Sequence, residues 1–272
     1  MNIKIVLEYD GSGFSGWQQQ TGSRSVEAEL KRALRELTGI DHKVYGAGRT
    51  DAGAHAVGQV VSFNLQGNLA PGRVMGGLNA KLPVDVSVVS AEIVPDEFHA
   101  RYSARWRRYR YRYLDRVARP ALDRDRCWHL PGRLDEAAMG LAAKPLVGRH
   151  DWTSYCSASE PADSRLRTMR SAEVRRVGDF VELELEAEGF LRGLVRGIAG
   201  ALAEVGSGRR PPEWVGEVLA SRDRKRAART APARGLTLMA VEYQNPDENK
   251  TSMKQARMKP HRMNQDVSIE TE

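Results

Sequence analysis

The sequence predicts an α+β protein, a two-layer α/β arrangement built from two similar halves. Segments with alternating apolar and polar residues, typical of half-buried strands, are interleaved with segments whose apolar residues recur at helical spacing. The same order of strands and helices occurs twice along the 272 residues, although no sequence repeat is evident. A chain of this length can form two medium domains, and we expect them at 1–100 and 101–245.

The first half begins with a clear strand pattern. Apolar residues alternate with other residues from Ile3 to Tyr9, which predicts a strand with one buried face. Residues 25–37 form a predicted helix because Val26 and the apolar residues after it recur on one face. Ser25 can cap the start of this helix and Gly39 its end. The other elements expected in this half are strands at 57–63 and 84–88.

The second half alternates again from Arg107 to Leu114, and from Phe180 to Glu188 with leucine and valine inward and glutamates outward. The remaining elements expected here are helices at 134–146, at 190–205 and from Pro211, and a last strand at 236–243. From Pro246 the pattern stops. The tail 246–272 is polar and almost without aliphatic residues, so we expect it to be disordered.

Composition favours a nucleic-acid partner. The net charge is +7 and the sequence pI is about 9.5, which suits a polyanion. Cys127 and Cys156 have neither disulfide nor metal-ligand spacing, and no metal or nucleotide motif is present, so we expect no cofactor and no metal. The sequence shows no signal peptide and no membrane span, so we expect a cytoplasmic protein.

One glycine-rich loop carries the best candidate for a catalytic group. In Gly46-Ala47-Gly48-Arg49-Thr50-Asp51-Ala52-Gly53-Ala54-His55, a single aspartate lies between two basic side chains. Glycine permits sharp turns and close ligand approach. Arg49 favours the ionised form of Asp51. The loop leads into a predicted strand, and catalytic residues are often found on loops that such a rigid element positions. His55 could act by its residue type as an acid or base, but we favour a structural or RNA-contacting role.

Six arginines lie between Arg101 and Arg112 with no acidic residue among them. Strand alternation places Tyr109 on one face and both Arg108 and Arg110 on the other. An arginine row can contact phosphates or form an ordinary solvated edge, and Tyr109 could stack on a base. In the predicted helix at 190–205, glycines beside Arg196 allow close packing while its guanidinium projects into a gap. A surface position for Arg196 is the alternative.

These residues resemble those of the tRNA pseudouridine synthase A family. Gly46 to Ala56 is similar to the family motif AGRTDAGVHA. Matching segments in the same order and spacing are Leu7–Gly11 with Gly16–Gln18, Gly58–Val61, Phe98–Arg101, Arg107–Tyr111, and Phe190–Leu191 through Val195–Arg196. Six motifs in register, spread from residue 3 to about 243, identify the chain as a member of this family.

The resemblance implies isomerisation of uridine to pseudouridine at positions 38 to 40 in the anticodon arm of tRNA. It also implies the pseudouridine synthase fold, in which two α/β halves with mixed or antiparallel sheets flank a basic cleft, and a homodimer without cofactor or metal. Asp51 matches the catalytic aspartate, Tyr109 the tyrosine at the target base, and Arg196 the arginine that pairs with the aspartate. Arg49 could help to keep the opened stem apart.

One carboxylate suits isomerisation better than hydrolysis by a glycosidase, which normally uses two. The residues leave open whether Asp51 attacks C1′ or C6, or assists a glycal route. They also leave two other functions open. In a non-catalytic RNA-binding protein Asp51 would only cap a turn, and a metal-dependent nuclease would need a carboxylate cluster that this sequence lacks.

Overall fold

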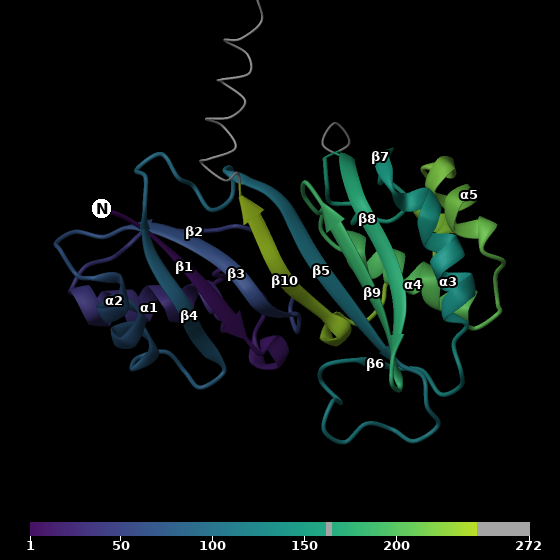
Figure 1. Ribbon diagram of the computed structural model, residues 1–272, viewed down its shortest axis with the longest axis horizontal. Coiled ribbons are helices and arrows are strands. Elements are labelled where there is room, and N and C mark those ends of the chain that lie inside the picture. Colours follow the sequence, from purple (N-terminus) through teal and green to yellow (C-terminus); the bar gives the residue numbers. More distant parts are fainter. Residues whose placement is uncertain (162–164, 244–272) are drawn as a thin grey trace, which may run out of the picture.

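The computed structural model describes residues 1–161 and 165–243, so the tail predicted at 246–272 lies outside the described residues. Figure 1 shows the elements in chain order. The strands are β1 (Asn2–Tyr9), β2 (Val44–Gly46), β3 (His55–Asn64), β4 (Val86–Val94), β5 (Ala104–Leu114), β6 (Trp128–His129), β7 (Gly148–Asp151), β8 (Leu166–Val177), β9 (Phe180–Ala187) and β10 (Leu236–Tyr243). The α-helices are α1 (Val26–Thr38), α2 (Pro71–Asn79), α3 (Glu136–Ala143), α4 (Leu194–Gly206) and α5 (Glu213–Ser221).

Within the described ranges, ten strands form one mixed sheet in the order β4-β1-β3-β10-β5-β9-β8-β7, with β2 on β3 and β6 on β5. The centre of the sheet joins the two halves of the chain. There β10 pairs in parallel with β3, with Thr237 opposite His55 and Leu238 opposite Ala56, and pairs antiparallel with β5. The start of β3, directly after the candidate catalytic loop, therefore lies beside a strand from the other end of the sequence.

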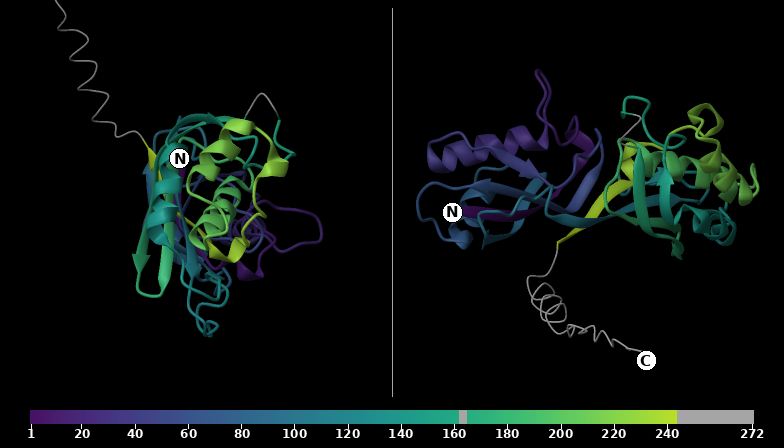
Figure 2. Two further views of the ribbon diagram at one scale, coloured as in Figure 1. Left: turned by 90° about the vertical axis from the view of Figure 1, so that its right-hand side faces the viewer. Right: turned by 90° about the horizontal axis from the view of Figure 1, so that it is seen from above.

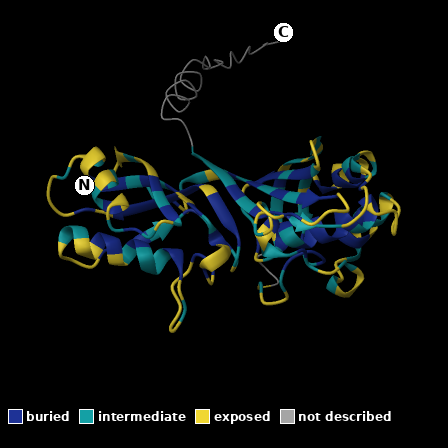
Figure 3. Ribbon diagram, turned by 90° about the horizontal axis from the view of Figure 1, so that it is seen from below, coloured by how far each residue is buried: buried dark blue, intermediate teal, exposed yellow. Residues whose placement is uncertain are grey.

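The helices form a second layer on one side of the sheet. Figure 2 shows α1 and the helices of the second half on the same side, and a hydrogen bond from Tyr113 on β5 to the Ala199 carbonyl of α4 joins the two layers (2.8 Å). A core of buried apolar residues spans both halves, and exposed residues lie mainly in loops and on outer helix surfaces (Figure 3). Nowhere in the described ranges is a helix both long and apolar enough to cross a membrane.

Several predicted elements are confirmed with small shifts in their ends. The alternation in β1 buries Ile3, Ile5, Leu7 and Tyr9. Helix α1 begins after Ser25, whose side chain accepts a hydrogen bond from the Ala28 N–H, and it ends at a left-handed glycine. The last strand, β10, has the predicted bounds. These elements follow local rules of capping and alternation.

Two helix ends differ from prediction. The helix expected from residue 190 begins at Leu194, because Gly193 adopts a left-handed backbone (φ 74°) that interrupts helical geometry before it. The helix expected over 134–146 is α-helical only at Glu136–Ala143 and closes as a 3-10 turn around Pro145. Proline lacks the N–H that would continue the helical hydrogen bonds.

The longest element absent from the sequence prediction is β8. Its sequence LRTMRSAEVRRV contains four arginines, and most of its residues are partly or fully exposed, so no apolar stripe marks it. Twelve residues nevertheless form a strand because β8 pairs with β7 over Leu166–Met169 and with β9 over Met169–Val177. The sequence prediction also omits α2, β2, β6 and β7. The domain boundary near residue 100 stays a prediction, since both segments share one sheet.

Candidate active site

The loop between β2 and β3 that carries Asp51 is attached to its surroundings at several points. The Ala47 N–H donates to the Val60 carbonyl (2.8 Å), and the Gln59 side-chain amide donates to the Gly48 carbonyl (2.7 Å). Next to Asp51, the Thr50 hydroxyl hydrogen-bonds the buried Tyr9 hydroxyl (2.8 Å). These bonds hold the loop before the aspartate, and the Gly53 N–H, which donates to the Phe14 carbonyl (3.2 Å), holds it after the aspartate. A catalytic carboxylate requires such support.

Glycine is needed where this loop meets its neighbours. Gly16 has a φ of 98°, and its backbone lies so close to the Thr50 carbonyl that a Cβ atom would clash with it. Gly48 lies against the Tyr109 hydroxyl, which would be 3.4 Å from an added Cβ. The glycines therefore let the loop approach the β1–α1 connection and β5 together.

Asp51 forms an ion pair with Arg196, although the two residues are 145 positions apart. The distance from Arg196 Nη1 to Asp51 Oδ2 is 2.8 Å, and the side chains are 24% and 22% exposed. The Arg196 Nε atom donates to the Ala231 carbonyl (2.7 Å), which orients the guanidinium. Within the described ranges no other hydrogen bond or ion pair engages the Asp51 carboxylate, so part of it stays open to a ligand.

The glycines of α4 bring Arg196 to this position. Gly197 contacts the Tyr155 carbonyl and Gly200 the Arg229 carbonyl so closely that a Cβ atom on either would overlap with that oxygen. The helix backbone therefore packs directly against two loops, and Arg196 extends from one side toward the β2–β3 loop. The predicted close packing is confirmed, and the alternative of a simple surface arginine is not what the structure shows.

Tyr109 reaches the same site from β5. It is 5% exposed, and its ring meets Phe190 edge-on with centroids 4.9 Å apart. Burial raises the pKa of the Tyr109 hydroxyl well above its usual value, and the nearby Tyr9 hydroxyl and Asp51 carboxylate raise it further. The phenol therefore stays protonated at neutral pH and offers an aromatic edge and a hydroxyl beside Gly48.

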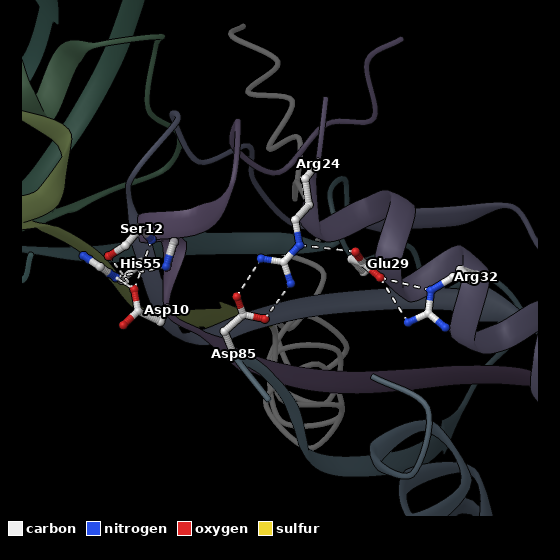
Figure 4. Close-up of polar contacts among 8 residues, drawn as sticks. Asp10, Ser12, Arg24, Glu29, Arg32, His55 and Asp85 are labelled. Atoms are coloured by element: carbon white, nitrogen blue, oxygen red, sulfur yellow. Dashed lines mark hydrogen bonds and ion pairs between the residues drawn. The ribbon is translucent and has the colours of Figure 1, made fainter. Parts of the chain in front are cut away.

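His55 lies at the other end of the loop, and Figure 4 shows its ring beside Asp10 and Ser12. Its Nδ1 accepts a hydrogen bond from the Gly11 N–H (3.1 Å) and lies 3.3 Å from an Asp10 carboxylate oxygen. Its Nε2 is 2.8 Å from the Asp125 carbonyl oxygen and 3.1 Å from that of Arg234. The buried ring joins three loops, which agrees with the structural role, whereas an RNA contact through His55 stays a prediction.

Arg49 differs from the buried His55 in its exposure and its contacts. It is exposed, and no hydrogen bond or ion pair joins it to another residue in the described ranges. It lies two residues before Asp51 on a fixed loop, so its guanidinium can contact a bound ligand without breaking a protein interaction. The predicted role in substrate binding is compatible with this position and stays a prediction.

Arg108 and Arg110 lie on the face of β5 opposite to Tyr109. Arg108 forms ion pairs with Glu186 of β9 (3.3 Å) and Glu242 of β10 (3.1 Å), and Arg110 lies 3.6 Å from Glu182. The glutamates expected to face solvent from β9 are therefore partly covered: Glu182 and Glu186 are 4% and 7% exposed. This charge ladder accounts for the arginine row without RNA, and the substrate contact predicted for both arginines stays untested.

The sequence reasoning missed the role of Arg107. This side chain is 9% exposed and donates to the carbonyls of Ala104, Glu188, Ala47 and Arg101 at 2.6–3.2 Å. It therefore links the candidate loop to the starts and ends of strands in the second half. A signal was present in the sequence: Arg107 shares a face with Tyr109, and an arginine on a buried tyrosine face requires internal acceptors.

A possible metal site and a cavity are the other features that bear on the location of the site. No group of three histidine, cysteine, aspartate or glutamate residues there could bind a metal ion. A cavity of about 300 Å³ is lined by His55, Asp10 and Arg110 among others. Asp51 is not part of its lining, so the chemistry indicated by the ion pair does not belong to that cavity.

Known proteins resemble this chain over most of its length. A sequence model of the family described as tRNA pseudouridine synthase matches residues 5–103 and 142–244. A Methylobacterium sp. (strain 4-46) protein named tRNA pseudouridine synthase A is 46% identical over 244 residues, which are 89% of this chain and 98% of the relative. Proteins of the same name from Photobacterium profundum and Myxococcus xanthus are 43% and 44% identical, over 91% and 89% of this chain and 94% and 92% of each relative.

A chain in the crystal structure of a Cbf5-Nop10-Gar1 complex aligns with 74% of this chain and 54% of its own length, at 12% identity and a TM-score of 0.34. That likeness is too weak to carry an argument. The sequence matches are not weak, since they extend over both halves. The family model covers the loop of Asp51 and the helix of Arg196, and the relative from Methylobacterium sp. (strain 4-46) aligns with 89% of the chain. The chain belongs to the tRNA pseudouridine synthase family, isomerases that convert uridine in tRNA to pseudouridine.

Proposed function

We propose that this enzyme isomerises uridines 38, 39 and 40 in the anticodon arm of tRNA, with Asp51 as its catalytic residue. The observation that carries the assignment of Asp51 is its ion pair with Arg196 at 2.8 Å, beside Tyr109. Three distant segments converge on one carboxylate that is partly open to solvent. A turn-capping aspartate in a mere binding protein needs no such convergence.

The reaction needs only groups that this chain supplies. The N1–C1′ bond of uridine breaks, the uracil turns, and a C5–C1′ bond forms. C5 releases its proton and N1 gains one, so the product has the mass of the substrate and no donor is consumed. An ionised carboxylate can act as the nucleophile in such a sequence; attack at C1′, attack at C6 and a glycal route all remain compatible with Asp51.

The neighbours of Asp51 have separate roles in this proposal. The target base must leave its stack to reach the carboxylate. The Tyr109 ring then packs against the uracil, and Arg196 keeps the carboxylate oriented. Arg49 contacts the opened stem from the exposed side of the loop. His55 fixes the end of the loop, whereas Arg108 and Arg110 pair with glutamates on the other face of β5.

Release of the C5 proton provides the test. Unmodified tRNA transcripts carrying tritium at uridine C5 should lose tritium to water in the presence of the protein and EDTA, and the Asp51→Asn variant should release none. Sequencing that detects pseudouridine should then place the product at positions 38 to 40. Binding without release would favour a non-catalytic RNA-binding protein, and release at other positions would retain the enzyme but refute the proposed site.

The proposal includes a cytoplasmic homodimer. Its support is the family resemblance of the motifs, so it needs its own measurement. Sedimentation of the purified protein should give twice the 30.3 kDa chain mass. A monomer that is fully active on tRNA would contradict the dimer. Fractionation of cells should recover the protein with the cytoplasmic tRNA pool rather than with membranes.

A further inference from the structure

Three aromatic rings pack in a row between β2 and the loop before β5, with neighbouring ring planes tilted by 45° and 37°; we call this row the stack. The ring centroids of Tyr45 and His99 are 4.4 Å apart, and those of His99 and Tyr102 are 4.5 Å apart. The last ring, Tyr102, is 77% exposed, whereas the other two are partly buried. The stack therefore ends in an aromatic ring that is open to solvent and supported from one side.

Positive charges flank both ends of this stack. The Lys43 ammonium lies 5.6 Å from the Tyr45 ring centroid, and the Arg101 guanidinium lies 5.6 Å from that of Tyr102. Lys43 and Arg101 are both exposed, and neither forms an ion pair with another residue of the described ranges. A ring with cations beside it fits a ligand that has both an aromatic face and a negative charge, as each nucleotide has.

The loop beneath Tyr102 is held by hydrogen bonds. His99 Nδ1 accepts from the N–H groups of Arg101 (3.1 Å) and Tyr102 (3.3 Å), and the Ser103 N–H donates to the His99 carbonyl (2.9 Å). Burial and the nearby Arg101 charge lower the pKa of His99, so the middle ring is neutral at pH 7. The exposed ring is therefore presented by a preorganised turn, which reduces the entropy that a ligand must overcome.

The stack is connected to the active site through Arg107. The Nη2 atom of Arg107 donates both to the Arg101 carbonyl (2.6 Å) and to the Ala47 carbonyl (3.2 Å), four residues before Asp51. The stack is also continuous with the candidate loop, because Tyr45 directly precedes Gly46. The aromatic surface is therefore linked to the loop of Asp51 both through the Arg107 side chain and through the chain itself.

We propose that Tyr102 stacks on an unpaired nucleobase of the substrate tRNA, a base other than the uridine that is isomerised. The inference rests on tRNA being the substrate and on Asp51 marking the active site. It assigns no part of the reaction to Tyr102, which contributes affinity and positions the RNA strand. Base–aromatic stacking tolerates any base, so this contact fits an enzyme that acts on more than one uridine.

Tyr102→Ala and Tyr102→Phe test the proposal, with Leu122→Ala as the matched control. Leu122 is 95% exposed and follows the opposite end of β5, far along the strand from Tyr102. We expect Tyr102→Ala to raise KM and Kd for unmodified tRNA about 5- to 140-fold, the range for losing one stacked base at about 1–3 kcal/mol. The kcat and the melting temperature should stay near wild type, Tyr102→Phe should restore affinity, and Leu122→Ala should change neither constant.

A spectroscopic readout identifies the contact itself. Anticodon stem-loop RNAs carrying 2-aminopurine at one unpaired position each are titrated with the Asp51→Asn protein, which does not turn over. Stacking on Tyr102 should quench the fluorescence at one position, and the quenching should vanish when Tyr102→Ala is added. Equal Kd values for wild type and Tyr102→Ala would overturn the proposal.

Loss of affinity together with a changed sedimentation coefficient would also overturn it, because Tyr102 would then contact a second protein chain. The result of the Tyr102 experiment can be distinguished from the result of the test of modification at positions 38 to 40. If wild-type enzyme modified another uridine, the Tyr102 comparison would still be read on that tRNA. If Tyr102 made no contact, modification at positions 38 to 40 would be unaffected.

Discussion

Two aspartate–arginine pairs in this molecule have nearly the same length and opposite surroundings. Asp51 and Arg196 are 2.8 Å apart, and Asp115 and Arg176 are 2.9 Å apart. The first pair joins the two halves at the active site. The second lies inside the second half, where the end of β5 meets β8 and the start of α3. The Asp51–Arg196 pair leaves a carboxylate oxygen open to a ligand, whereas the Asp115–Arg176 pair stabilises the fold.

The Asp115 pair is saturated. Both of its carboxylate oxygens accept from Arg176 (3.0 and 2.9 Å), and one also accepts from the Leu134 N–H (2.9 Å). Arg176 donates further to the Leu134 carbonyl and to Glu136. The Asp115 side chain is 1% exposed, against 22% for Asp51. Asp115 therefore has no free capacity for a ligand, whereas Asp51 retains an oxygen without a partner in the part of the chain that the structure describes.

The sharpest test of this comparison is Asp51→Asn. We expect kcat on tRNA to fall at least about 10⁴-fold, as for loss of a nucleophile, while Kd for tRNA changes little. Because Asp51 is partly exposed, the melting temperature should change by only a few degrees. Single-turnover kinetics and filter binding give the two constants. Turnover close to that of wild type would refute the catalytic assignment.

The matched change in the other pair is Arg176→Met. It leaves Asp115 buried without its partner, and we expect unfolding free energy to fall by about 3–5 kcal/mol, as for other broken buried pairs. Urea unfolding followed by circular dichroism measures this loss. At a temperature where the variant stays folded, its kcat should equal that of wild type. A large drop in kcat would mean that the two pairs are coupled, and the comparison would fail.

Substitution of Arg107 tests whether the Asp51–Arg196 pair depends on the position of the β2–β3 loop. Arg107→Met removes the four carbonyl contacts that link Ala47 of the loop to the second half. We expect kcat to fall up to about 100-fold with little change in KM, because misplacement by about 1 Å can cost that much. Arg107→Lys, which keeps a donor, should recover part of the rate. If Arg107→Met lowered only stability, as Arg176→Met does, then Arg107 would not position the loop.

Lowering the pH should remove the stability that the Asp115–Arg176 pair contributes. Burial alone would raise the pKa of Asp115, but the hydrogen bonds from Arg176 and the Leu134 N–H outweigh it, so the pKa lies below its usual 3.8. A carboxyl with a lowered folded-state pKa stabilises the fold above its unfolded value, and that stability is lost as pH falls through the folded pKa. Urea unfolding between pH 5 and 2, pH values chosen around that usual value, should show a steeper loss for wild type than for Arg176→Met. Parallel curves would contradict this.

The sequence predicted the elements that local rules determine. Ser25 and Gly39 delimit α1, and the alternation in β1 and β10 is read directly from residue type. It did not predict β8, because that strand is defined by pairing with β9 and its exposed arginines form no apolar pattern. A strand of this kind depends on a partner elsewhere in the chain, and single-sequence periodicity carries no information about it.

The sequence predicted only part of the site, because local patterns are visible in it and contacts between distant segments are not. The loop of Asp51 is contiguous, so its glycines and charges stand out in the sequence. The contact of Asp51 with Arg196 spans 145 residues, and it was expected only through the family resemblance. The arginines of β5 show the limit most clearly. Their alternation was read correctly, but their partners, Glu182 and Glu186, come from β9 and could not be known from the arginine row.

Arg110→Ala tests whether this β5 arginine only pairs with a glutamate of β9 or also contacts RNA. Of the variants considered, it should change stability and activity least. Glu182 keeps Arg112 (3.3 Å) and Arg175 (3.1 Å) when Arg110 is removed, so we expect a stability loss of about 1 kcal/mol or less. A phosphate contact would instead reduce the slope of log Kd against log salt by about one. We expect an unchanged slope, measured by filter binding with tRNA, because Arg110 lies on the sheet face opposite to Tyr109. A reduced slope would return Arg110 to the RNA-binding surface and extend the functional region to both faces of β5.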